Sequence, residues 1–63
     1  MKRVFRIKIH YADGSRNNYD VVAKDDQSAR AMAIKKDSAD YARAKVKPPR
    51  VDYCEITWTA DAI

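Results

Sequence analysis

The side chains that could do chemistry in this 63-residue chain are few and far apart. His10 is the only histidine and Cys54 the only cysteine. A nucleophile needs a neighbouring base, and a zinc site needs several nitrogen or sulfur ligands, so these two residues predict neither. The pair Asp25-Asp26 precedes an alanine-rich stretch and suits a helix N-cap better than a metal ion. We therefore expect no enzyme activity, no metal site and no cofactor.

One charged segment stands out from the rest of the chain. Between positions 43 and 50 lie four basic residues and no acid, whereas the other nine Lys and Arg are matched by nine Asp and Glu. The net charge of +4 therefore resides in this segment. Such a patch attracts phosphate groups or an acidic protein surface, although basic residues at a helix end also serve to offset the helix dipole. The expected topology also brings Arg16, next to the hairpin turn, close to this segment. The predicted basic pole consists of Arg16, Arg43, Lys45, Lys47 and Arg50.

Two strands joined by a tight turn are expected to position part of this pole. Apolar and polar residues alternate with period two in both segments, and Ala12-Asp13-Gly14 lies between them. A three-residue loop with left-handed Gly14 pairs Ile7 with Tyr19, whereas a two-residue turn would pair Ile7 with Asp20. We therefore predict the three-residue loop, which also sets Arg6 opposite Asp20. The two strands cover residues 3–11 and 16–23.

A helix is expected over residues 26–46. Small and apolar residues recur at helical spacing, and Lys47-Pro48-Pro49 ends the helix because the residue before a proline is pushed out of the α region. Asp37-Ser38 interrupts the apolar stripe, which leaves open a continuous helix or one kinked near 37–38. The residues of the predicted buried stripe are Ala29, Met32, Ala33, Ala39, Ala42 and Val46.

A last strand is expected over residues 50–59, followed by a frayed tail from Thr59 to Ile63. Alternation in this strand allows two orientations. In the preferred one, Tyr53 faces outward and three apolar residues are buried. In the other, Val51 and Tyr53 point inward and the outer face gains Trp58. The residues buried in the preferred orientation are Cys54, Ile56 and Trp58.

These segments predict a single α+β domain over residues 1–63, in the order strand, strand, helix, strand. A right-handed crossover places the last strand beside the first, which gives a three-stranded antiparallel sheet of order 2-1-3 with one helix on one face. The other face stays open and is the second candidate binding surface. Both outer strands are exposed edges, so a homodimer through an edge strand is a further option. The candidate residues of the open face are Arg6, Lys8, His10 and Tyr53.

The sequence pattern resembles a group of known proteins. An Asp-Gly hairpin, then Val21-Val22-Ala23 leading through Asp25-Asp26 into an alanine-spaced helix, and a final strand occupy residues 3–58. This pattern and size resemble the small accessory proteins encoded by bacteriophages, among them anti-CRISPR proteins and inhibitors of host RNA polymerase. The resemblance implies stoichiometric binding that occludes a host protein or nucleoprotein complex.

The sequence therefore predicts a non-catalytic protein-binding module, with direct nucleic-acid binding through the basic pole as the alternative. An open sheet that binds RNA needs exposed aromatic residues, and in the preferred orientation only Tyr53 and Tyr11 qualify. The single cysteine is typical of a reducing compartment, and no apolar run approaches the length of a membrane span. We expect a cytoplasmic protein without membrane contact.

Overall fold

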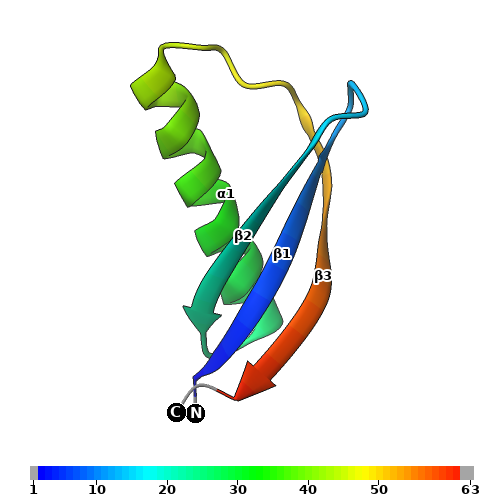
Figure 1. The fold of residues 1–63 in the computed structure, drawn as a ribbon, viewed down its shortest axis with the longest axis vertical. Helices are drawn as coiled ribbons and strands as arrows, with labels where there is room; N and C mark the ends of the chain where they lie inside the picture. Colours follow the sequence, from blue (N-terminus) through cyan, green and yellow to red (C-terminus); the bar gives the residue numbers. More distant parts are fainter. Residues whose placement is uncertain (1, 62–63) are drawn as a thin grey trace.

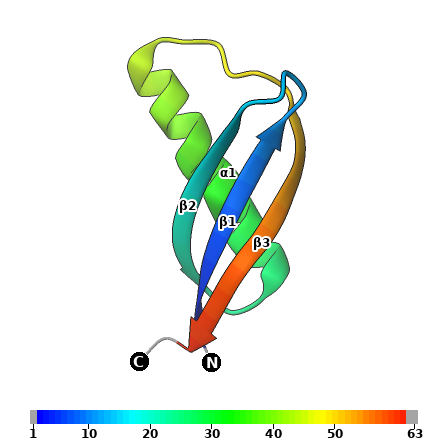
Figure 2. The ribbon, with the colours of Figure 1, turned by 45° about the vertical axis from the view of Figure 1, so that its right-hand side comes forward.

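Three strands and one helix make up residues 2–61, the part of the chain that the computed structural model describes (Figure 1). The sheet is antiparallel with the order β2-β1-β3, and the helix covers one of its faces (Figure 2). This arrangement confirms the predicted fold class and strand order. The elements are β1 (Arg3–Tyr11), β2 (Arg16–Ala23), α1 (Asp26–Ala44) and β3 (Val51–Asp61).

The hairpin between β1 and β2 has the predicted register. The N–H of Tyr11 donates to the carbonyl of Ser15, and the N–H of Gly14 donates to the carbonyl of Tyr11, both at 3.0 Å. Gly14 has a φ of 88°, a conformation that a residue with a Cβ adopts at a cost. Ile7 is paired with Tyr19, so the apolar residues of both strands face the helix. Turn chemistry and hydrophobic pattern agree, which is why the sequence defined this register.

The helix begins as predicted and ends earlier than predicted. Asp25 is the N-cap, and its side chain accepts a hydrogen bond from the N–H of Ser28 at 2.7 Å. The helix ends at Ala44 rather than at residue 46, because Lys45 adopts the left-handed conformation, with a φ of 57°. A single helix runs through residues 37–38, so the continuous alternative is the correct one.

The last strand is longer than predicted at its C-terminal end. β3 begins at Val51, one residue after the expected start, and continues to Asp61, which pairs with Arg3. The prediction of a frayed tail is therefore wrong for residues 59–61, because β1 extends far enough to pair with them. Residues 62–63 lie outside the part of the chain that the structure describes.

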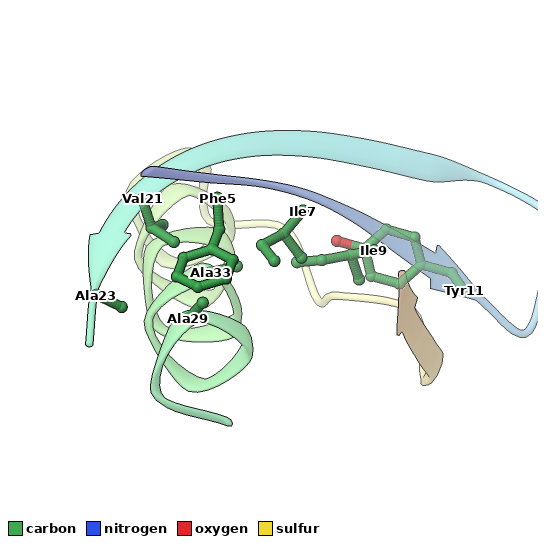
Figure 3. Close-up of a cluster of buried hydrophobic side chains, with 8 residues drawn as sticks. All are labelled: Phe5, Ile7, Ile9, Tyr11, Val21, Ala23, Ala29 and Ala33. Atoms are coloured by element: carbon green, nitrogen blue, oxygen red, sulfur yellow. The ribbon is translucent and has the colours of Figure 1, made fainter. Parts of the chain in front are cut away.

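The core lies along β1 and is thin on the helix side (Figure 3). Only two alanines of α1 are buried among the apolar side chains, so the predicted broad stripe is wrong. Met32 is 40% exposed and Val46 is 55% exposed, and Ala39 and Ala42 are also exposed. The buried positions follow a spacing of four residues, because α1 packs on β2 and β1 and barely touches β3. The buried apolar residues are Phe5, Ile7, Ile9, Tyr11, Val21, Ala23, Ala29 and Ala33.

Two register shifts between β1 and β3 change the faces of the last strand. Ile7 pairs with Ile56 and Arg6 pairs with Trp58, so Thr57 is an extra residue in β3. A second shift, between His10 and Tyr11, makes Asp52 extra as well. The shift at Thr57 reverses the alternation beyond it. The prediction that Trp58 is buried is therefore wrong, whereas Cys54 and Ile56 do face the core.

Candidate functional site

The open face of the sheet carries an exposed aromatic residue that the preferred orientation of the last strand did not place there. Trp58 lies on the outer face beside its partner Arg6 and is 49% exposed. The guanidinium carbon of Arg6 lies 5.4 Å from the centroid of the Trp58 ring, within the range of a cation–π contact. The register shift at Thr57 is what pairs Arg6 with Trp58, and strict alternation along the strand does not predict this shift.

A second aromatic pair lies at the hairpin end of the same face. The rings of His10 and Tyr53 are stacked, with centroids 4.2 Å apart and planes at 11°. His10 Nε2 also donates to Glu55 Oε1 at 2.9 Å. The imidazole is thus held by a ring on one side and a carboxylate on the other, while Tyr53 remains 53% exposed. The structure therefore brings the predicted residues His10 and Tyr53 into direct contact.

Each carboxylate next to these rings has a hydrogen-bond partner. Arg6 donates to Asp20 through Nε at 3.0 Å, in the cross-strand pair that the sequence predicted. Its hydrogen bond with Asp20 raises the pKa of Arg6, which is fully charged in any case. Lys8, between the two aromatic pairs, is half-buried. The surface that results mixes paired charges with exposed rings. We call it the aromatic face, made of Arg6, Lys8, His10, Tyr53, Glu55 and Trp58.

The five residues of the predicted basic pole all lie at the hairpin end of the molecule (Figure 1). The N–H of Ala12 donates to the carbonyl of Arg50 at 2.8 Å, which ties the segment after α1 to the hairpin. All five side chains are exposed. Arg43 contacts Asp40 at 3.3 Å, and no carboxylate within residues 2–61 forms an ion pair with the other four.

A polar cluster that sequence reasoning missed joins the helix to the hairpin. Asp37 is only 3% exposed and accepts hydrogen bonds from the Tyr11 hydroxyl, from Tyr19 at 2.8 Å and from Asn17 at 3.0 Å. The sequence did contain a signal for this buried aspartate, because Asp37 follows Ala33 by four residues and so continues the buried stripe. The cluster borders a cavity of about 250 Å³. Its lining residues are Asn17, Tyr19, Asp37, Asp40, Tyr41, Ala44 and Val46.

The protonation states of this cluster suit a structural role. Burial and the hydrogen bonds to Asp37 raise the pKa of both Tyr11 and Tyr19, so the two hydroxyls remain protonated donors. Every buried side-chain nitrogen and oxygen of the described residues has a partner. A carboxylate with three donors is satisfied without a cation, so the arrangement fastens α1 to the sheet.

The free thiol is poorly suited to nucleophilic chemistry. Cys54 is half-buried on the core side of β3, and this burial raises the pKa of its thiol, which keeps the reactive thiolate scarce at neutral pH. Within residues 2–61, no group of three His, Cys, Asp or Glu side chains could hold a metal ion. The described helix is not long and apolar enough to cross a membrane.

Each free sheet edge carries a feature that disfavours further pairing. Lys36 Nζ donates to the carbonyl of Asp20 at 3.3 Å, so part of the β2 edge is occupied by a helix side chain. The register shifts at Asp52 and Thr57 make β3 irregular, and bulges are a common protection of edge strands. A homodimer through an edge strand stays a prediction.

In comparisons with known proteins, no family model matches this sequence, and neither a curated protein nor a solved structure matches it. The functional interpretation therefore rests on the residues and their geometry.

Proposed function

We propose that this chain is a non-catalytic binding module that holds a protein partner on its aromatic face. The observation that supports the proposal is that the exposed rings are already held by neighbours, Trp58 by Arg6 and Tyr53 by His10. Trp, Tyr and Arg most often dominate the binding energy of protein interfaces. Side chains that are fixed before binding lose less conformational entropy when a partner arrives.

The charges of this face favour a protein over a nucleic acid there. Glu55 lies beside the rings and Asp20 beside Arg6, and both carboxylates would repel phosphate groups. Bases stack on free ring faces, whereas one face of Tyr53 is covered by His10 and Arg6 lies over Trp58. A surface of paired charges around aromatic anchors is the usual composition of a protein interface.

The mode of action that we propose follows the phage proteins that the sequence pattern resembles. A rigid domain of this size, bound in a one-to-one complex, blocks whatever surface of the partner it covers. The partner is then a host protein or nucleoprotein complex, and the setting is the cytoplasm, in keeping with a single unpaired cysteine.

Site-specific photo-crosslinking tests the proposal. A benzophenone amino acid replaces Tyr53 on the aromatic face or, as a matched control, Met32 on the exposed side of α1. In a bacterial lysate we expect one protein to crosslink from position 53 and not from position 32. Excess unlabelled protein should compete, and excess Trp58→Ala protein should not. Crosslinks that are equal from both positions, or that form only with nucleic acid, would overturn the proposal.

A further inference from the structure

A second surface, independent of the aromatic face, has a different composition. The basic pole carries five positive charges in a chain of net charge +4, and it lies at the end of the molecule where the hairpin turns and α1 ends (Figure 2). Three separate segments contribute to it, namely the start of β2, the end of α1 and the connection to β3. Charges that are distant in sequence are thus assembled at one end.

The backbone of the pole is held in place by hydrogen bonds. The N–H groups of Lys45 and Val46 donate to the carbonyls of Ala42 and Tyr41, each at 3.1 Å, which caps the last turn of the helix. The two prolines that follow restrict the chain, and the bond from Ala12 to the Arg50 carbonyl fixes its far end. The basic side chains therefore project from a fixed frame.

Three acids lie near the pole, and they differ in their contacts. Asp13 at the hairpin tip accepts from the N–H and the hydroxyl of Ser15, at 2.9 Å and 2.6 Å, and these bonds lower its pKa. Asp40 contacts Arg43 and Tyr19. Asp52 forms no ion pair within residues 2–61. This end of the molecule therefore has five basic side chains and three carboxylates.

We propose that the basic pole binds the phosphate backbone of duplex DNA without reading its sequence. The molecule measures 35 × 22 × 14 Å along its principal axes, so its end spans at most about six base pairs at ~3.4 Å per base pair. Four cations of the pole have no carboxylate partner in the described residues, so about four phosphates are neutralised. Single strands are bound by stacking of bases on aromatic rings, and no pole residue is aromatic. The unpaired cations and the lack of aromatic residues in the pole both favour a duplex, which has a dense backbone charge, over a single strand.

Fluorescence anisotropy with a labelled duplex of about 20 base pairs tests this inference. For about four neutralised phosphates, the slope of log affinity against log salt is about −3.6, so affinity falls about 150-fold between ~50 and ~200 mM salt. The doubly substituted variant Lys45→Gln, Lys47→Gln should have a slope near −1.8, because two phosphate contacts are lost.

A matched control separates the pole from net charge. The variant Lys24→Gln, Lys35→Gln removes the same charge from exposed residues outside the pole and should keep the original slope. Circular dichroism confirms that both variants are folded. Equal loss in the two variants would overturn the inference, because net charge alone would then explain binding.

Two further probes distinguish the anion that is bound. The single strand of the same sequence should bind more weakly than the duplex, since the pole has no rings for base stacking. Tighter binding of the single strand would overturn the duplex assignment. Retention of polyglutamate without binding of duplex DNA would also overturn it and would identify an acidic protein as the partner of the pole. Because Tyr53 and Trp58 lie outside the pole, either result leaves the proposed function of the aromatic face unaffected.

Discussion

β1 is flanked by β2 on one side and by β3 on the other, and the two pairings are built differently. The β1–β2 pairing is regular over its whole length and is covered by α1, with Asp37 and three hairpin side chains fastening the helix to it. The β1–β3 pairing has two register shifts and little helix cover. The regular side supplies most of the core, whereas the irregular side presents Trp58 and Tyr53 to solvent. The stabilising contacts and the exposed aromatic residues thus lie on opposite sides of β1.

Substitutions in the central strand and on the irregular flank should differ most in their effect on stability. Ile7 is fully buried, so Ile7→Ala should lower the free energy of unfolding by about 3 kcal/mol. Ile56 is half-buried, and Ile56→Ala should cost about half as much. Urea unfolding followed by circular dichroism measures both.

Because a domain of this length has only roughly 3 to 9 kcal/mol of stability, Ile7→Ala could unfold the protein. The milder pair Ile7→Val and Ile56→Val keeps the comparison measurable, with about 1 kcal/mol expected for Ile7→Val. Equal losses at positions 7 and 56 would contradict the tighter packing of the central strand relative to the irregular flank.

The polar cluster around Asp37 should make the next largest contribution to the free energy of unfolding. Asp37→Ala removes the acceptor that Tyr11, Tyr19 and Asn17 share and leaves the buried Tyr11 hydroxyl without an acceptor, so it should cost about 2 to 3 kcal/mol. Asp40→Ala, three residues further along the helix, removes only exposed contacts and should cost under about 1 kcal/mol. Thermal unfolding compares the two, and similar values would mean that Asp37 does not fasten the helix.

The same cluster predicts sensitivity to alkaline pH. The pKa values of Tyr11 and Tyr19 are higher in the folded protein than their usual value of about 10, because burial and Asp37 disfavour the phenolates. The stabilisation is fully present below pH ~10 and is lost as pH rises further, because the unfolded chain then releases protons that the folded protein retains. Urea unfolding from pH ~9 to ~11 should show this decline, and Tyr19→Phe should reduce it. A decline of unchanged size in Tyr19→Phe would contradict this origin.

The smallest stability effects are expected on the irregular flank. Trp58→Ala should cost under about 1 kcal/mol, whereas a buried tryptophan would cost about 3 to 5 kcal/mol. Deletion of Thr57 should leave Trp58 exposed, because removing the extra residue restores alternation without changing the partner of Trp58. Tryptophan fluorescence and acrylamide quenching should therefore change little. A large red shift after the deletion would show that Trp58 had been buried.

The order of elements and the hairpin register follow from the sequence because they depend on local signals, and the strand order then follows from the right-handed crossover rule. Alternation in residues 3–11 and 16–23, one glycine at the turn and a capping aspartate act over a few residues. The concentration of charge at 43–50 is a property of the sequence alone, and it reaches the hairpin end because the helix starts where the second strand ends and runs back along the sheet.

Tertiary structure decided which side chains reach the surface. The shift at Thr57 cannot be read from alternation, because a bulge adds one residue to a strand and reverses every face beyond it. The width of the buried helix stripe depended on how far α1 reaches across the sheet, and Asp37 is buried because hairpin donors meet it there. Which of these side chains is buried depends on contacts between residues that are distant in sequence. For that reason the aromatic face is complete only in the folded chain.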